Sequence, residues 1–234
     1  MTPFKTLVAG LAVAALVLPA AADEPPVEII GATVNFGQVT QQKIVVHDFF
    51  IKASGGQQLK ITTMFSGCGC TEIPLGDSIV PANDSLPLRI EFSTGNFRGL
   101  VVKSPTIRTD LTGDLPLKMD ILAEVLPDGD SAWPVVLQPE MVDVSQFGQE
   151  ERRRASFFMV NRSDENLKVT PVDTALLAFQ VKVPDVIKAG EKVEGRLRVR
   201  EDKIEEKFTE SVTFKLDGRE TYFVTLPVER FYRE

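Results

Sequence analysis

The sequence predicts an all-β protein of two tandem antiparallel β-sandwiches that follow a cleaved signal peptide. Three observations support this fold class. Apolar and polar residues alternate along most of the chain, and helical periodicity is almost absent. Turn residues divide the alternating runs at intervals of about ten residues, as in sandwich domains. The order of strand-like segments in the first half also recurs in the second half, which predicts two similar domains.

The first 22 residues have the layout of a secretory signal. Lys5 gives a charged start, Leu7–Leu18 contains no charged residue, and small residues, Ala20–Ala22, end the segment. The apolar run is shorter than the ~20 residues that a membrane-spanning helix needs. We therefore predict a cleaved signal peptide over residues 1–22, with an uncleaved membrane anchor as the alternative. The mature chain is expected to have no transmembrane span and to lie in the periplasm or another extracytoplasmic compartment.

The mature chain is acidic. The full sequence has a formal net charge of −7, and removal of the signal takes away one cation, Lys5, and no acid, which gives −8. The one cationic run, Arg152–Arg154, follows Glu150 and Glu151. An acidic chain without a basic cluster argues against nucleic acid as a partner. The predicted partner is a protein or an envelope component, and the sequence specifies no oligomeric state.

Period-two alternation predicts the strands of the first sandwich, which we place at residues 27–126. Lys43–Lys52 is rich in β-branched and aromatic residues, and Leu86–Phe92 alternates strictly between apolar and other side chains. Ser54–Gly56 forms a turn between two strands, and Asp128–Asp130 ends the domain. The predicted strands are residues 33–36, 43–52, 59–64, 86–92, 99–110 and 115–125.

After this break the pattern starts again. Phe36–Gln38 matches Phe147–Gln149, 111 positions later, and Leu59–Thr62 matches Leu167–Thr170, 108 positions later. Matching strands with small drifts at the turns are expected of a duplicated domain. The sequence therefore predicts a second β-sandwich over residues 134–234 that is a degenerate repeat of the first. One larger sandwich or barrel is the alternative.

Both cysteines of the chain lie in one loop, directly after the strand predicted at residues 59–64. The alignment of the two halves places Cys68 opposite Leu176 and Cys70 opposite Ala178. If the second half folds in the same way without cysteines, the fold does not require them. The Cys-Gly-Cys loop is therefore the candidate functional site.

A disulfide between Cys68 and Cys70 is the first possibility, and an oxidising compartment favours it. The two Cα atoms must approach to within about 4.4–6.8 Å, which requires the loop to bend. Gly69 is expected to supply the bend by adopting a positive φ. Because so short a loop gains little stability from closure, the bridge should be easily reduced. This favours a redox-sensitive contact over a structural staple.

Metal binding is the second possibility, because two thiolates on one loop are soft ligands that suit copper or zinc. A structural zinc site needs four ligands, and the remaining candidates are Met64, His47 and Met119. Met64 and Met159 alternate with apolar residues, as core residues do, and a lone histidine within a strand is more often packed or solvated than a ligand. The third possibility is a local clip or a thiol pair without chemistry.

Nothing in the sequence predicts an enzyme. It has one histidine, no G-x-S-x-G or H-E-x-x-H motif, and no glycine-rich phosphate loop. A catalytic pair of His47 with Cys68 or Cys70 would need a contact that the sequence does not indicate. We therefore predict a non-enzymatic protein without a cofactor. The alternative is thiol-disulfide exchange, or copper or zinc handling, through Cys68 and Cys70.

At these residues the first half resembles a known family, the bacterial domain of unknown function 1573 (DUF1573). The shared features are a short Phe-Gly strand, a Phe-rich strand, Leu-Lys-Ile-Thr, the loop Cys68-Gly69-Cys70-Thr71, and a Pro-Ala-Asn-Asp turn. The usual loop of the family is Ser-Cys-Gly-Cys-Thr, so Gly67 stands where serine is usual. Ala82-Asn83 replaces a turn that usually contains glycine. The resemblance covers residues 30–125.

The resemblance implies that the two tandem antiparallel β-sandwiches are immunoglobulin-like, related in shape to ASH-type domains, and part of an exported protein with no assigned activity. The second half looks like a degenerate relative without the motif. Cys68, Cys70 and Thr71 match the family loop. We therefore expect Cys68 and Cys70 to act as a redox or disulfide pair, and Gly67, Gly69 and Thr71 to shape the loop.

Overall fold

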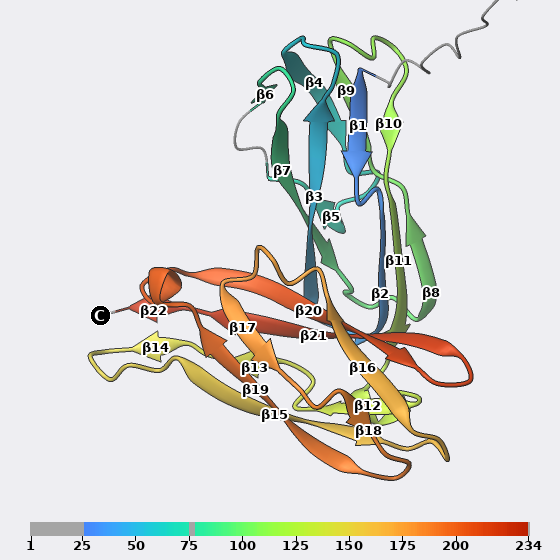
Figure 1. Ribbon diagram of the computed structural model, residues 1–234, viewed down its shortest axis with the longest axis vertical. Helices are drawn as coiled ribbons and strands as arrows, with labels where there is room; N and C mark the ends of the chain where they lie inside the picture. The colour runs from blue at the N-terminus through green and yellow to red at the C-terminus, as the bar shows by residue number, and fades with distance from the viewer. Residues whose placement is uncertain (1–25, 75–77, 234) are drawn as a thin grey trace, which may run out of the picture.

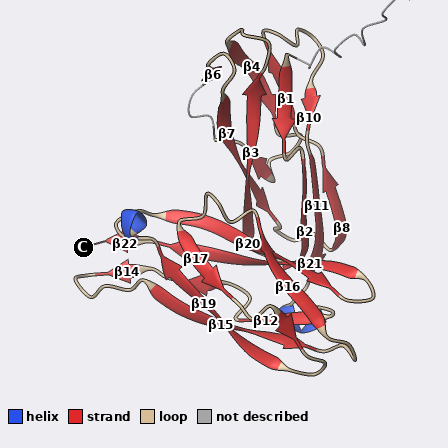
Figure 2. Ribbon diagram, in the orientation of Figure 1, coloured by secondary structure: helices blue, strands red, loops and turns tan. Residues whose placement is uncertain are grey.

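The computed structural model describes residues 26–74 and 78–233, which form two β-sandwiches (Figure 1). Within these ranges the helical elements are two short 3-10 helices, η1 (Gly129–Ser131) and η2 (Glu201–Lys203), as Figure 2 shows. No helix in the described part of the chain is long and apolar enough to cross a membrane. The predicted signal peptide, residues 1–22, lies outside the described residues.

The first sandwich packs two sheets face to face. Its strands are β1 (Val27–Ile30), β2 (Thr33–Thr40), β3 (Ile44–Ala53), β4 (Leu59–Phe65), β5 (Thr71–Glu72), β6 (Ile79–Val80), β7 (Ser85–Ser93), β8 (Gly99–Lys103), β9 (Thr106–Thr109), β10 (Leu117–Lys118) and β11 (Asp120–Leu126). One sheet has the order β1-β3-β7-β5 and the other the order β10-β9-β4-β6. β11 follows β10 in the chain and lies between β2 and β8.

Alternation decides which side chains fill the first core. β7 buries Leu88, Ile90 and Phe92, which are every second residue of the strand, as the sequence predicts. Phe36 of β2 and Phe49 of β3 belong to the same core, and each is 1% exposed. Burying a side chain of this size stabilises the fold by about 1.5–3 kcal/mol. Apolar burial is therefore what holds the two sheets together.

The second sandwich repeats the strand order of the first. Its strands are β12 (Val135–Gln138), β13 (Val142–Asp143), β14 (Gln146–Phe147), β15 (Arg154–Asn161), β16 (Leu167–Val172), β17 (Phe179–Lys182), β18 (Val186–Ile187), β19 (Lys192–Val199), β20 (Phe208–Asp217), β21 (Thr221–Arg230) and β22 (Tyr232–Arg233). The order β12-β15-β19-β17 repeats β1-β3-β7-β5, and β18-β16-β20-β21 repeats β6-β4-β9-β10. The domain limits, 27–126 and 134–234, stay a prediction.

The predicted fold class, two tandem immunoglobulin-like sandwiches, is confirmed, but not every strand pair is antiparallel. β2 pairs in parallel with β11 and with β21. An antiparallel sandwich has no such pairs, and a parallel connection needs a long crossover, usually a helix. Here the rest of the first sandwich lies between β2 and β11 in the chain and serves as the crossover, so no helix is required.

β2 joins the two sandwiches, because it pairs with β11 of the first and β21 of the second. The resulting sheet has the order β18-β16-β20-β21-β2-β11-β8. At the junction, the hydroxyl of Thr225 donates to the carbonyl of Phe36 at 2.5 Å. A Cβ on Gly37 would lie only 2.0 Å from the carbonyl oxygen of Phe223, so the two backbones can approach this closely only at a glycine.

A second contact between the sandwiches is polar and buried. Ser211 Oγ of β20 accepts a hydrogen bond from the N–H of Val46 in β3 and donates one to its carbonyl, both at 2.8 Å. Beside it, Glu210 is 4% exposed and accepts hydrogen bonds from Arg89 at 3.4 Å and from the Ala178 N–H at 2.7 Å. Burial raises the pKa of Glu210 despite these partners.

Candidate functional site

The Cys-Gly-Cys loop, residues 66–70, carries the chain from one sheet of the first sandwich to the other. It begins where β4 ends, at Phe65, which pairs with Thr106 of β9. It ends at β5, whose Thr71 pairs with Phe92 of β7. Strand pairing therefore fixes both ends of the loop.

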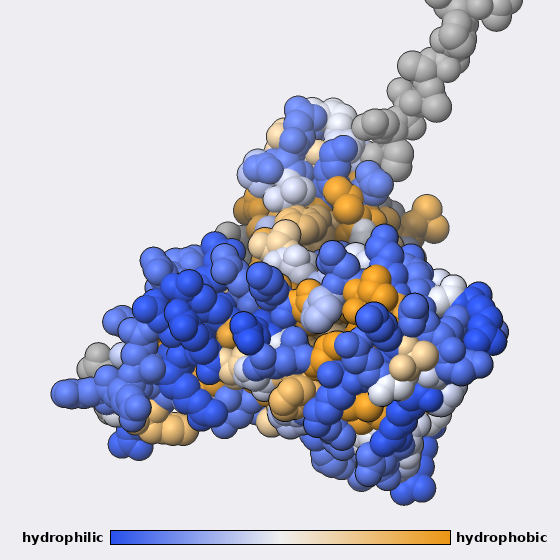
Figure 3. Space-filling view, turned by 60° about the horizontal axis from the view of Figure 1, so that its bottom comes forward, coloured by the Kyte–Doolittle hydropathy of each residue, from blue (hydrophilic) through white to orange (hydrophobic). Residues whose placement is uncertain are grey.

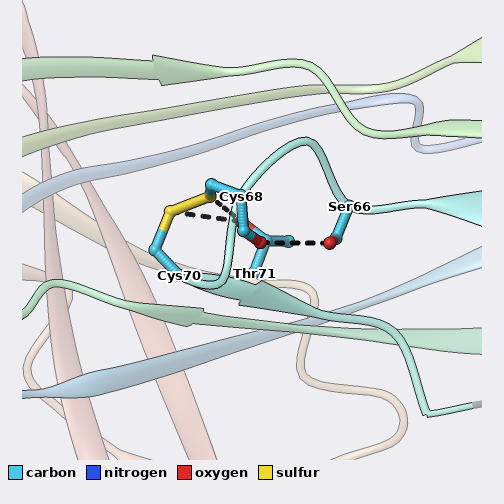
Figure 4. Close-up of a disulfide and its surroundings, with 4 residues drawn as sticks. All are labelled: Ser66, Cys68, Cys70 and Thr71. Carbon is cyan, nitrogen blue, oxygen red and sulfur yellow. Dashed lines mark hydrogen bonds between the residues drawn. A yellow bond between two sulfur atoms is a disulfide. The ribbon is translucent and has the colours of Figure 1, made fainter.

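Cys68 and Cys70 form a disulfide in the structure, with Cα atoms 5.2 Å apart (Figure 4). This separation lies within the range that a disulfide requires. The positive φ belongs to Gly67, at 79°, and not to Gly69, so the expectation for Gly69 is wrong. The chain reverses before Cys68, where Ser66 Oγ donates to the Cys68 carbonyl at 3.0 Å. That reversal uses the left-handed conformation, which glycine adopts without steric cost.

Thr71 directs its hydroxyl at the two sulfur atoms. Its Oγ1 lies 3.6 Å from Cys68 Sγ and 3.9 Å from Cys70 Sγ (Figure 4), and the residue is 1% exposed. A hydroxyl bonds a disulfide sulfur only weakly, but it forms a stronger, charge-assisted hydrogen bond with a thiolate. Thr71 is therefore placed to stabilise the reduced, ionised form of the pair.

The loop lies between the core and an exposed surface. Cys70 and Met64 are half-buried and pack against the first core. Phe65 is 64% exposed. A concavity of about 410 Å³ opens beside the loop and is lined by Met64, Ser66, Thr71, Glu72, Ile73 and Pro74. An exposed aromatic ring near such a concavity suits contact with a protein partner.

The equivalent loop of the second sandwich has no disulfide. The Ala178 carbonyl accepts from the Arg200 N–H as the Cys70 carbonyl accepts from the Ser93 N–H, which confirms the alignment of Cys70 with Ala178. Leu177 is 6% exposed and packs into the second core. Apolar burial anchors this loop, whereas a disulfide closes the first one.

The other candidate metal ligands do not join the cysteines. His47 lies on β3 where the sandwiches meet, and its Nδ1 is 3.8 Å from a carboxylate oxygen of Asp173. Burial lowers the pKa of His47, while Asp173 and Asp48 oppose that shift. Met119 and Met159 are 2% and 0% exposed. Among the described residues, no three His, Cys, Asp or Glu side chains form a metal-binding group. Two sulfur atoms alone do not fit a four-ligand zinc site.

The structure also gathers cations that lie apart in the sequence. Arg154 of β15, Lys182 of β17, and Arg196 and Arg198 of β19 line a concavity of about 950 Å³ on the second sandwich. In the antiparallel pairing of these strands, Arg154 lies opposite Arg198 and Lys182 lies opposite Arg196. Glu194 forms an ion pair with Arg196, and Figure 3 shows a mainly hydrophilic surface over this sandwich. Three separate strands contribute these cations, so they form no basic cluster in the order of the sequence, and the expected absence of such a cluster is wrong.

No curated protein matches the sequence. Among solved structures, a protein of unknown function from Porphyromonas gingivalis W83 is 12% identical, with a TM-score of 0.39, over 87% of this chain and 99% of that chain. The ASH/PapD-like domain 7 of human CEP192 is 10% identical, with a TM-score of 0.35, over 50% and 97%. The periplasmic chaperone SfaE is 10% identical, with a TM-score of 0.32, over 88% and 100%.

The family comparison concerns the first sandwich. Residues 27–125 match the family described as "Protein of unknown function (DUF1573)". The matched segment contains the whole Cys-Gly-Cys loop, and the second sandwich lies outside it. The resemblance found in the loop sequence is thereby confirmed: the N-terminal sandwich of this chain is similar to the DUF1573 family, whose description assigns no function.

Proposed function

We propose that this chain is a non-enzymatic envelope protein, exported to the periplasm or another extracytoplasmic compartment, that binds another protein or an envelope component. The Cys-Gly-Cys loop is its redox-sensitive contact, with Cys68 and Cys70 as the disulfide pair and Gly67, Gly69 and Thr71 shaping the loop. Neither a cofactor nor nucleic acid takes part. One observation carries the proposal: of two equivalent loops in the same fold, only the one beside an exposed phenylalanine has a disulfide.

The redox change in this proposal is confined to the loop. A thiol reductant transfers two electrons and two protons to the sulfur atoms, which breaks the S–S bond and leaves Cys68 and Cys70 as thiols, while the reductant becomes a disulfide. The freed loop can then move relative to Phe65. A partner that contacts both would bind the oxidised and reduced forms with different affinity.

The first test replaces both cysteines in the full chain, Cys68→Ser and Cys70→Ser. We expect a folded variant whose Tm falls by at most about 4 °C, because closing so short a loop contributes little entropy. Leu177→Ser in the equivalent loop is the matched control. It should lower Tm further, because it places a hydroxyl in an apolar core. Global unfolding of the double variant in circular dichroism would rule out an accessory role for the cysteines.

Thiol-disulfide exchange, or copper or zinc handling through Cys68 and Cys70, is the second candidate function. The observation that favours it is the Thr71 hydroxyl, which is buried against both sulfur atoms. In exchange, the thiolate of a partner attacks one sulfur and forms a mixed disulfide, while the other sulfur leaves as a thiolate. Copper(I) would instead bind the two thiolates of the reduced loop.

A Cys70→Ser variant purified from its own envelope separates the two candidates. If exchange is the function, Cys68 should retain a partner as a mixed disulfide that a reductant releases. Native mass spectrometry of the reduced wild type, after addition of copper(I) or zinc, tests for a retained metal. The absence of both an adduct and a metal would exclude this second candidate.

A further inference from the structure

β8 forms an open edge of the sheet that runs through both sandwiches. It is the last strand in the order β18-β16-β20-β21-β2-β11-β8 and pairs with β11 alone among the described strands. Figure 1 shows it at the outer side of the first sandwich. β9, the next strand after β8 in the chain, pairs with β4. The last residue of β4, Phe65, lies opposite Thr106 of β9, so β4 ends before it could run alongside β8. The free side of β8 therefore has no strand partner within the described chain.

The side chains exposed on this edge are apolar. Leu100 and Val102 project from the same face of β8, and they are 74% and 54% exposed, whereas Val101 between them is buried. Natural edge strands are commonly protected by a charged residue, a proline or a bulge. β8 contains no proline, its one charged residue is Lys103 at its last position, and its register with β11 is unbroken. The unpaired backbone N–H and C=O groups of such an edge can pair with a strand of another chain.

The second sandwich shows how the equivalent strand segment is used. The first half of β20 pairs with β21 as β8 pairs with β11, and it likewise extends beyond its neighbour β16, whose last pair joins Val172 to Thr213. This segment is covered: Ser211 within it binds both backbone groups of Val46 in the first sandwich. In the second sandwich this segment is therefore covered by the first sandwich, whereas no described strand covers the equivalent segment, β8.

The charges beside β8 argue against a second copy of this chain as the partner. Arg98 and Lys103 flank the apolar stretch. If two β8 strands paired antiparallel about Val101, Arg98 of one chain would lie opposite Ser104 of the other, one position from Lys103. Two cations would therefore gather at each end of the strand pair and repel each other. Glu124 of β11 faces this edge by register but already accepts a hydrogen bond from Gln38. The cationic ends favour an acidic partner.

We propose that β8 is the docking edge for an extended segment of a partner protein that has apolar residues at alternate positions and a carboxylate near one end. The segment adds a strand to the sheet through its backbone, covers Leu100 and Val102 with its apolar side chains, and places its carboxylate beside Arg98. The inference rests on the proposed function only in that the partner is a protein, and it does not depend on the redox state of Cys68.

Selection of random seven-residue peptides on the immobilised full chain tests this proposal. Alternating apolar sequences with a terminal Asp or Glu should be enriched. The double variant Leu100→Lys, Val102→Lys should bind a selected peptide at least roughly ten-fold more weakly. The matched control Leu115→Lys alters a loop residue that is 78% exposed, and it should leave the affinity unchanged. Circular dichroism verifies that each variant retains the wild-type fold.

Hydrogen exchange provides the second measurement. The amides of Gly99–Lys103 should exchange more slowly when a selected peptide is bound. The proposal is overturned if no peptide is enriched, or if enriched peptides bind the double lysine variant as tightly as the wild type. It is also overturned if the wild type forms a dimer that the double lysine variant loses, because the occupant is then a second copy.

The cysteine variant separates this proposal from the function proposed for the loop. Peptide binding that survives in Cys68→Ser, Cys70→Ser supports docking at β8, whatever the loop does. Binding that is lost only in that variant assigns the peptide to the loop and overturns docking at β8.

Discussion

Thr71 links the local structure of the first sandwich to the chemistry of its loop. The residue is almost fully buried, and its hydroxyl lies within 4 Å of both sulfur atoms, at 3.6 and 3.9 Å. Its backbone position is fixed because it begins β5 and pairs with Phe92. A rigidly held donor of this kind stabilises a thiolate more than a disulfide sulfur. At the scale of one residue, this geometry predicts that Thr71 makes the loop easier to reduce.

Thr71→Val should make the Cys68–Cys70 disulfide harder to reduce. Valine keeps the shape of the side chain but removes the donor. A loss of about 1 kcal/mol from the reduced form corresponds to a potential roughly 20 mV more negative. Equilibration with a dithiol buffer, followed by alkylation and mass spectrometry, measures the shift. Thr71→Ser retains the hydroxyl and should stay near the wild type, and equal potentials for all three proteins would contradict the role of Thr71.

At the scale of elements, the Phe-Gly-Gln sequence occurs twice in different surroundings. Gly37 of β2 has a φ of 60°, and an added Cβ would meet the backbone of Phe223. Its counterpart Gly148, directly after β14, has a φ of 87° and open space around the position of a Cβ. The two glycines share a backbone conformation, but only Gly37 lies against the other sandwich.

Gly37→Ala should therefore destabilise the protein more than Gly148→Ala. Each alanine must adopt a left-handed conformation, which costs about 1–2 kcal/mol. Gly37→Ala must also push β2 and β21 apart, which brings its total cost to about 2–4 kcal/mol. Urea denaturation of the two variants measures the difference. Equal losses of stability would show that the close approach between β2 and β21 contributes nothing.

At the scale of the whole molecule, the two sandwiches are joined by polar contacts as well as by a shared sheet. His47, the single histidine of the chain, lies at this junction with a side chain that is 10% exposed. Its Nε2 is buried without a hydrogen-bond partner. Burial lowers the pKa of His47 below its ordinary value of 6.5, although Asp173 and Asp48 raise it in part. Protonation of His47 is therefore unfavourable in the assembled protein.

Acidification should weaken the protein through His47. Below about pH 6.5 the unfolded chain takes up a proton that folded His47 binds only at lower pH, so stability is lost as the pH falls through this window. Tm measured between pH 7.5 and 5.5 should fall less in His47→Gln than in the wild type. Asp173→Asn removes an opposing charge and should steepen the fall. Identical pH profiles for the wild type and His47→Gln would refute this account.

The sequence by itself determined the architecture and the position of the loop. Side chains of a strand alternate between core and solvent, so the pattern of Leu88, Ile90 and Phe92 predicts a buried face without knowledge of the partner strands. The internal repeat also placed Cys70 opposite Ala178, and matching backbone hydrogen bonds confirm it. These features are local or recur along the chain, which is why residue order alone is sufficient to predict them.

Only the tertiary structure decided how the sandwiches meet, which edge is bare and which glycine bends the loop. The contact between Val46 and Ser211 joins residues 165 positions apart, and no periodic pattern marks such a pair. The exposure of β8 depends on where β4 ends, and the bend at Gly67 depends on the hydrogen bond of Ser66. Periodicity specifies which side chains face a core, but it carries no information about contacts between cores or unpaired sheet edges.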